Sequence, residues 1–345
     1  MKKKLISFFK IFAALGLGIF VIWLSVKNIT PEQKISILDS FKIANYWWVI
    51  LSIVIGILSH LMRAVRWKML LEPMGYNPST WSTFLAVMVG YFTNLGIPRS
   101  GEVARCSILY KEANIPVDKS FGTVIIERSI DMIIFFSLFF FTIASQYKYL
   151  DNYVQTEIYP KLNEKFAFIP TEHLFGNTAI ALFVIAILVF LVFRKRFFAS
   201  KFWLKISKLL GGIWEGLKSI AKIKQPVLFI TYSIGIWVFY YLMIYLCLLS
   251  LPETASLSLV VGLSVLVIGS IGIMVTPGGI GLYPVLVAQT LFLYGISKES
   301  GAGVAIGWIT WSAQTLMIIV VGAISLLIVS ANSKKRHVTL SEDKE

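Results

Sequence analysis

The chain has 345 residues, of which 57% are hydrophobic and 14% are charged, and its mean hydropathy is +0.77. Because a soluble domain carries about 25% charged residues, this composition excludes a soluble protein and predicts an all-α, polytopic membrane protein. The formal net charge of +14 is explained by the positive-inside bias and by attraction to anionic inner-leaflet lipids. No nucleic-acid partner is expected.

Six segments are predicted to span the membrane as helices, and two more are predicted to enter it and return as broken-helix hairpins. The first span follows three lysines and has no small-residue cleavage site, so we expect it to be retained. The predicted spans are residues 5–26, 46–61, 121–145, 178–193, 226–251 and 303–329, and the predicted re-entrant hairpins are residues 81–115 and 255–295.

Residues 90–105 concentrate glycine, proline and polar side chains directly after an apolar run that is too short to span a bilayer. Irregular backbone is tolerated at membrane depth only where it is buried in protein or lines a wet cavity. We therefore interpret residues 81–115 as a re-entrant hairpin with its hinge at Gly96, Pro98 and Gly101.

The distribution of basic residues favours a hairpin that enters from the cytoplasm. If residues 81–95 do not cross, 23 of the 32 Lys and Arg residues lie in the inside segments and seven lie outside. A crossing there would instead place the nine basic residues of 194–225 outside, against the positive-inside rule. Both termini are then expected in the cytoplasm.

The second hairpin repeats the pattern of the first. Gly90 precedes Pro98 by eight residues, and Gly269 precedes Pro277 by eight. The order of span, span, hairpin and span also recurs, beginning on opposite sides of the membrane. This predicts a single membrane domain, 1–345, built from inverted repeats at 5–145 and 178–330, with the second hinge at Pro277, Gly278, Gly279 and Gly281. Chance recurrence of Gly and Pro is the alternative, and two full crossings in 255–295 leave the same flanking charges.

Residues 198–224 carry apolar residues at steps of three and four with lysines mostly elsewhere on the helical wheel. This pattern is typical of an amphipathic helix on the anionic cytoplasmic leaflet. A connector with one solvated face would show the same pattern.

Two carboxylates, Glu127 and Asp131, are spaced i, i+4 and so share one face of the predicted helix 121–145. They cannot both ionise cheaply when buried without a cation, and Arg128 points elsewhere on the helix. Their partners are expected among Arg63, Arg66, Arg99 and Arg105. Ionisable residues within a membrane are functional candidates, although a structural salt-bridge cluster that holds the hairpin is a compatible alternative.

The arginines also suit a lipid phosphate, because a guanidinium binds phosphate bidentately and broken helix ends expose unpaired N–H groups. For Arg63 and Arg66, ordinary anchoring at the cytoplasmic side is an equal alternative. The predicted substrate-binding residues are Arg63, Arg66, Asn94, Arg99, Glu102, Arg105, Glu127, Arg128 and Asp131.

No motif predicts an enzyme of a familiar class. The sequence has no Walker loop, dinucleotide-binding motif or visible Ser–His–Asp grouping, and its two cysteines and three histidines are too scattered for a disulfide or a metal site. We therefore predict no cofactor, no metal and no catalytic residue.

Four motifs in order resemble those of the lysylphosphatidylglycerol synthase membrane-domain family, also called flippase-like: R-A-x-R-W-K-x-L-L at 63–71, N-L-G-I-P-R-x-G-E-x-x-R at 94–105, E-R-x-x-D at 127–131 and P-G-G-I-G at 277–281. The resemblance covers about residues 5–330. It implies the lipid-translocating part of the family without the cytoplasmic aminoacyl-transfer domain. Pro284 stands where members often have Glu, which removes that carboxylate from the comparison.

Together these features predict a lipid translocase of the bacterial plasma membrane. Its substrate would be a phospholipid, including an aminoacylated one, or a polyprenyl-linked lipid. The alternatives are an intramembrane lipid-modifying transferase and a non-catalytic accessory subunit of a cell-envelope glycosyltransferase. A homo-oligomer and a separate lipid-synthesising enzyme both stay open as partners.

Overall fold

The computed structural model describes residues 30–97, 100–146, 160 and 223–342, with side chains described as far as residue 332. Within these ranges every regular element is helical, as the composition predicted. The predicted spans 5–26 and 178–193, and nearly all of the predicted interfacial helix 198–224, lie outside the described residues. The helices that are long and apolar enough to cross a membrane cover Tyr46–Met74, Pro226–Leu248 and Ala302–Asn332.

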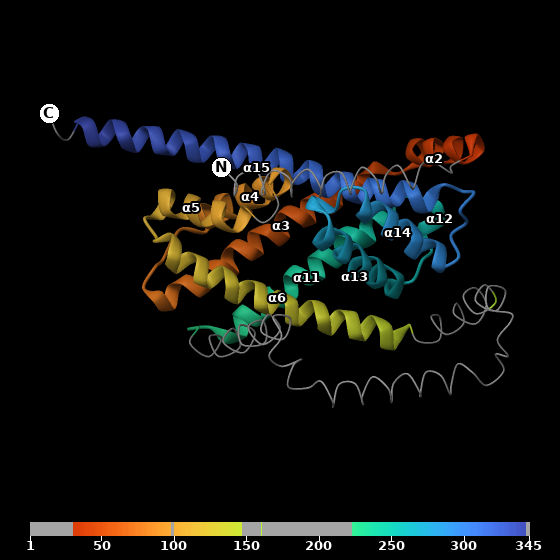
Figure 1. Cartoon of the computed structure of the whole chain (residues 1–345), viewed down its shortest axis with the longest axis horizontal. Helices are drawn as coiled ribbons and strands as arrows, with labels where there is room; N and C mark the ends of the chain where they lie inside the picture. Colours follow the sequence, from red (N-terminus) through yellow and green to blue (C-terminus); the bar gives the residue numbers. More distant parts are fainter. Residues whose placement is uncertain (1–29, 98–99, 147–159, 161–222, 343–345) are drawn as a thin grey trace, which may run out of the picture.

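Two helices pack side by side at the centre of the molecule. Helix α3 (Tyr46–Leu71) begins at Asn45, whose side chain accepts a hydrogen bond from the Trp47 amide, and α11 (Pro226–Leu248) packs along it (Figure 1). Ser52 on α3 donates to the Met243 carbonyl on α11 at 2.9 Å. Helix α3 continues ten residues beyond the predicted span, so its arginines lie inside the helix bundle.

The first hairpin consists of α4 (Thr80–Gly96) and α5 (Gly101–Ala113). Ser79 starts α4 by accepting a hydrogen bond from the Ser82 amide. The two helices touch through backbone, because a Cβ on Gly101 would clash with the carbonyl oxygen of Gly90. Only glycine permits so close an approach, so the turn depends on these two positions.

The second hairpin consists of α13 (Leu259–Val275), a short 3₁₀ turn η3 (Pro277–Gly279) and α14 (Leu282–Leu293). Gly278, Gly279 and Gly281 all have positive φ, between 59° and 74°, a conformation that side chains with a Cβ disfavour. Trp311 Nε1 donates to the Gly278 carbonyl at 2.8 Å and fixes the turn.

Two long helices border the bundle on opposite sides in Figure 1: α6 (Val117–Ser145) and α15 (Ala302–Glu342). Helix α4 packs on α3 and on α15, whereas α13 packs on α11 and on α6. The turns of the two hairpins meet, since a Cβ on Gly278 would lie 2.9 Å from Leu95 Cδ2. The short elements α2 (Pro31–Ile43), η1 (Glu72–Met74) and α12 (Pro252–Ala255) complete the described chain.

Candidate functional site

Three arginines and two carboxylates meet in the interior beside the first hairpin. Helix α3 supplies Arg63 and Arg66, α5 supplies Arg105, and α6 supplies Glu127 and Asp131. The spacings i, i+3 on α3 and i, i+4 on α6 place each pair on one helix face. We call these five residues the arginine cluster; every side chain in it is at most 11% exposed.

Glu127 is the centre of the arginine cluster and has no exposed surface. Its Oε1 accepts from Arg63 Nη1 at 2.5 Å and lies 3.3 Å from Arg66 Nη2, while its Oε2 accepts from Arg105 Nη2 at 3.0 Å. One carboxylate therefore holds three guanidinium groups from two helices in place. Removing it would leave three buried guanidinium groups with Asp131 as the remaining carboxylate of the cluster.

Asp131 binds two of the same arginines one turn further along α6. Arg63 Nη1 donates to Asp131 Oδ2 and Arg66 Nη1 donates to Oδ1, each at 2.7 Å. Distances of this size are typical of charge-assisted hydrogen bonds. Arg63 bridges both carboxylates, so the two acids share cations as the sequence predicted.

The arginine cluster carries one more positive charge than negative, because three guanidinium groups face two carboxylates. Several of its N–H donors have no hydrogen-bond partner among the described residues: Arg63 Nε, Arg66 Nε, Arg66 Nη2 and Arg105 Nε. A buried excess cation with spare donors is costly unless an anion compensates it. The arrangement can therefore accept one further anionic group.

Aromatic and hydroxyl groups that the sequence did not single out complete the cluster. Arg63 Nη2 donates to Tyr240 Oη of α11 at 3.2 Å. The Arg105 guanidinium stacks over the Trp67 ring at 4.5 Å. Trp67 lies one residue after Arg66 in the R-A-x-R-W-K motif, so it could have been found there; Tyr240 had no such signal.

His60 lies one turn before Arg63 on α3 and is 4% exposed. Its ring packs on Tyr91 and Tyr240, with centroid distances of 4.6 and 6.3 Å, and its Nδ1 has no hydrogen-bond partner in the described part of the chain. From the sequence, the three histidines were predicted to be too scattered to form a site. The i, i+3 spacing from His60 to Arg63 was the available signal that they share a face.

Other predicted site residues lie apart from the arginine cluster. Arg128 Nη2 pairs with Glu102 Oε1 at 2.9 Å, and this pair is partly exposed, at 43% and 24% of the two side chains. Asn94 Oδ1 accepts from the Gly101 amide at 2.7 Å, so it caps α5 across the hinge. Arg99 and the hinge residue Pro98 lie outside the described residues.

The remaining hinge residues have distinct local roles. Gly96 ends α4, and a Cβ there would meet nothing within 4 Å. Pro277 begins η3, where a missing N–H costs little. Pro284 lies in the first turn of α14, and its carbonyl oxygen touches Gly307 of α15 so closely that a Cβ would clash. That position therefore contributes backbone packing and no charge.

No group of three His, Cys, Asp or Glu residues that could hold a metal ion occurs in the described part of the chain. Cys106 and Cys247 are both free and buried. The charged groups that meet at the site are three guanidinium groups and two carboxylates.

Comparison with known proteins places these features in a family context. The model of the family described as "Lysylphosphatidylglycerol synthase TM region" matches residues 11–331. The UPF0104 membrane protein MJ1595 of Methanocaldococcus jannaschii is 26% identical over 307 residues, which cover 84% of this chain and 87% of that protein.

A shorter match joins the chain to the glycosyltransferase AglD of Haloferax volcanii. The two are 27% identical over 124 residues, which cover 36% of this chain and 19% of AglD. No solved structure matches the chain. The family match over residues 11–331 includes the helices that carry the arginine cluster.

Proposed function

Because the chain belongs to the lysylphosphatidylglycerol synthase transmembrane-region family, we propose that this membrane protein is a flippase-like lipid translocase. It moves a lipid with a phosphate-containing polar headgroup, including an aminoacylated one, between the two leaflets. The observation that carries the proposal is the arginine cluster, with its one uncompensated positive charge and its unpartnered N–H donors.

A lipid phosphate fits this cluster on chemical grounds. Guanidinium groups bind phosphate oxygens through paired hydrogen bonds, and the phosphodiester brings the single negative charge that balances the excess. The carboxylates Glu127 and Asp131 keep the three arginines aligned before the lipid arrives. To bind the phosphate, Arg66 or Arg105 must exchange a carboxylate partner for a phosphate oxygen. This exchange favours weak, transient binding of the lipid over tight binding.

We further propose that the two hairpins are re-entrant and related as an inverted repeat. Helices α4 and α13 have 17 residues each, about 25 Å, against a hydrocarbon core of about 30 Å. The first helix of each hairpin packs on the helix before it in its own repeat and on the last helix of the other repeat. Helix α4 contacts α3 and α15, and α13 contacts α11 and α6. In transporters with such repeats the broken helices meet at the interface between the repeats, and here the two breaks meet at Leu95 and Gly278.

The proposed location is the bacterial plasma membrane with both termini in the cytoplasm, as the basic residues predict. The predicted roles of Arg99, Glu102 and Arg128 belong to the same proposal. Glu102 and Arg128 form the half-exposed pair that a headgroup would meet before it reaches the buried arginines.

A transport assay tests the proposal. The protein is reconstituted into liposomes that contain headgroup-labelled phospholipids, and a membrane-impermeant quencher reports the label that remains in the inner leaflet. We expect the wild type to accelerate leaflet exchange, and Arg66→Gln to slow it at least tenfold. Arg66→Lys, which keeps the charge and loses the fork geometry, should fall between them.

Lys42→Gln is the control, because Lys42 lies on α2 with 75% of its side chain exposed. Equal exchange in protein-free and wild-type liposomes for every lipid class would contradict the proposal. So would an Arg66→Gln protein that is folded and as fast as the wild type.

The match to AglD favours a second candidate, an accessory subunit of a cell-envelope glycosyltransferase. This candidate predicts a stable complex with such an enzyme and no lipid movement by the chain alone. A lipid extract from a deletion strain separates both candidates from a lipid-modifying transferase, because only the transferase changes which lipid products are present.

A further inference from the structure

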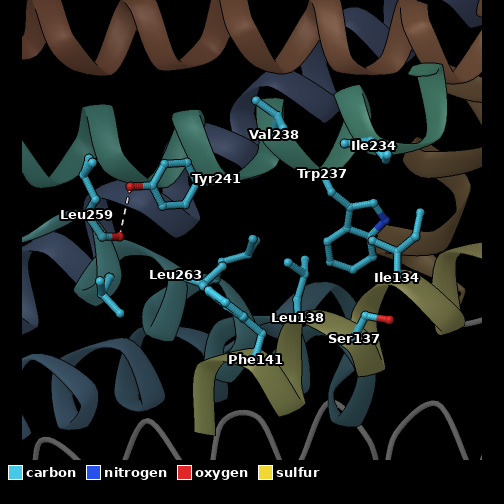
Figure 2. A pocket seen from close by; sticks show the side chains of 12 residues that line it. Ile134, Ser137, Leu138, Phe141, Ile234, Trp237, Val238, Tyr241, Leu259 and Leu263 are labelled. Carbon is cyan, nitrogen blue, oxygen red and sulfur yellow. Dashed lines mark hydrogen bonds between the residues drawn. The ribbon is translucent and has the colours of Figure 1, made fainter. Parts of the chain in front are cut away.

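A second site lies beside the arginine cluster and has the opposite chemistry. It is a pocket of about 550 Å³ between α6, α11 and α13, shown in Figure 2 with Trp237 at one end and Tyr241 and Leu259 at the other. Its walls are hydrocarbon: Leu138 and Phe141 from α6, Val238 from α11 and Leu263 from α13 are among them.

Two of the three polar side chains that line the pocket, Ser137 and Tyr241, are engaged by backbone, whereas Trp237 Nε1 is buried without a hydrogen-bond partner among the described residues. Ser137 Oγ donates to the Ile133 carbonyl at 2.9 Å, and Tyr241 Oη donates to the Leu259 carbonyl at 2.9 Å (Figure 2). The Trp237 indole N–H is thus the side-chain donor at the pocket that has no partner among the described residues, and the rest of the lining selects for apolar surface.

The pocket lies next to the arginine cluster. Ile134, which lines it, follows Asp131 by three residues, about 4.5 Å along α6. On the facing helix, the Trp237 ring packs edge-on against Tyr240 with centroids 6.0 Å apart, and Tyr240 accepts a hydrogen bond from Arg63. One aromatic layer thus separates the apolar pocket from the charged groups.

The pocket opens sideways, onto the apolar exterior of the bundle. Phe141 and Leu259 at its rim are each 61% exposed, and Ile234 is 54% exposed. Exposed apolar side chains on a helix of a membrane protein face hydrocarbon at low cost, so a lipid can enter from the bilayer without crossing water.

We propose that this pocket binds one acyl chain of the phospholipid whose phosphate meets the arginine cluster. The inference rests on the proposed translocase function and names its substrate class more closely, as an acyl phospholipid. The volume decides between occupants: about 550 Å³ is in the range of a small-ligand site, which holds one acyl chain and is too small for a long polyprenyl chain.

The position of the pocket gives the acyl chain a role in transport. Helix α6 follows the first hairpin, whereas α11 and α13 come from the second half of the chain. A chain bound among them contacts both halves at once, so its length affects how the halves move against each other. Acyl-chain length then becomes a determinant of which lipids are moved.

Photo-crosslinking tests this directly. The full-length protein is placed in vesicles of phosphatidylethanolamine that carries a diazirine at the end of one acyl chain, and labelled peptides are identified by mass spectrometry. We expect labels to concentrate on the segments 134–141 and 259–266 of α6 and α13. Leu263→Trp, which fills the pocket, should reduce that labelling at least fivefold.

Two further variants keep the test decisive. Ser137→Trp narrows the mouth from an exposed position, and it should also reduce labelling if Leu263→Trp fails to fold. Leu327→Trp on α15 is the matched control, because Leu327 is 70% exposed and lies outside the pocket. Labels spread evenly over exposed apolar residues would overturn the proposal, as would stronger labelling of the pocket by a diazirine polyprenyl phosphate.

The same samples separate this inference from the function on which it rests. Pocket labelling without leaflet exchange would refute the translocase and keep the acyl site. Leaflet exchange with no pocket labelling would keep the translocase and refute the acyl site.

Discussion

The two hairpins share a backbone plan and differ completely in chemistry. Each has a 17-residue first helix, a Gly- and Pro-containing break and a shorter second helix of 13 or 12 residues. The first hairpin presents Arg105 to the arginine cluster and Glu102 to its rim. The second hairpin contributes no charged side chain to the arginine cluster. At its break, Gly272 packs closely against the Tyr283 backbone, and Trp311 donates a hydrogen bond to the Gly278 carbonyl.

This difference indicates a division of labour. The half that ends in α6 supplies every charged group of the arginine cluster, and the second half supplies Ser233 and Tyr240 through α11. A charged site is expensive to build in a membrane, so duplicating it would add cost without adding a second phosphate. The second hairpin instead contributes close packing and, beside it, the apolar pocket.

The largest expected loss of stability comes from removing Glu127, the central carboxylate of the arginine cluster. Glu127→Ala leaves three buried guanidinium groups facing Asp131 alone, and we expect a loss of about 3–5 kcal/mol in unfolding free energy. Thermal unfolding in detergent, followed by intrinsic fluorescence, measures it.

Glu102→Gln is the matched control for that experiment. Its partner Arg128 is 43% exposed, and water screens such a pair, so the expected cost is below about 1 kcal/mol. Equal destabilisation by the two substitutions would show that the arginine cluster is not electrostatically distinct from the rim.

Close backbone packing gives the next largest effect. In Gly101→Ala the new Cβ meets the Gly90 carbonyl oxygen and lies 2.6 Å from the Asn94 side chain, whereas in Gly272→Ala it lies 2.9 Å from Tyr283 Cα. We expect about 3 kcal/mol for the first and about 1–2 kcal/mol for the second, by the same unfolding measurement. Gly96→Ala, with nothing within 4 Å, should be neutral; a cost there would mean that the hinge and not the packing sets stability.

Removing either of the hydrogen bonds at the two helix breaks should lower the unfolding free energy by a similar amount, smaller than the glycine substitutions do. Asn94→Ala removes the acceptor for the Gly101 amide, and Trp311→Phe removes the donor to the Gly278 carbonyl. Each should cost about 1 kcal/mol. Asn94→Asp keeps the acceptor and should recover most of the loss, and an Asp variant as unstable as Ala would assign another role to Asn94.

The smallest expected effect is on the pH dependence of stability, and it involves Glu299 in the loop between α14 and α15. The pKa of Glu299 is below its usual range because the Ser297 hydroxyl donates to its carboxylate, with help from the backbone. A lowered pKa in the folded state stabilises above the ordinary carboxyl pKa of about 4.3. That contribution disappears as pH falls through the folded pKa.

Melting temperature should therefore drop slightly more between pH 5 and pH 3 (about the range of carboxyl titration) in the wild type than in Ser297→Ala. Because Glu299 is exposed, we expect a shift near the limit of detection. Identical pH profiles would mean that the hydroxyl does not hold the carboxylate in solution.

Much of the scaffold was predictable because hydrophobic patterning and Gly/Pro breaks act locally. The predicted break at residues 277–281 separates α13 from α14, and the predicted span 121–145 lies within α6 (Val117–Ser145). The end of α3 was not predictable from hydropathy. Helix α3 runs past Leu61 because Arg63 and Arg66 are neutralised by acids from α6, a contact between residues 64 and 65 positions apart.

The membership of the arginine cluster was only partly predictable for the same reason. The i, i+4 spacing of Glu127 and Asp131 predicted that they share one helix face. Because two buried carboxylates need cations, arginine partners were expected, and the expected set includes the three observed. Which arginine binds which oxygen, and the pairing of Glu102 with Arg128, depend on how α5 lies across α6. Tyr240 is one of 14 tyrosines and is distinguished only by the helix packing that brings it to Arg63.

The central claim is that the arginine cluster recognises a lipid phosphate. Native mass spectrometry of the protein released from its own membrane tests it most directly, by comparing the lipid retained by the wild type with that retained by Arg105→Gln, which removes the excess charge. We predict a phosphate-bearing lipid on the wild type and at least tenfold less on the folded variant. A retained lipid without phosphate, or equal retention by both proteins, would contradict the account.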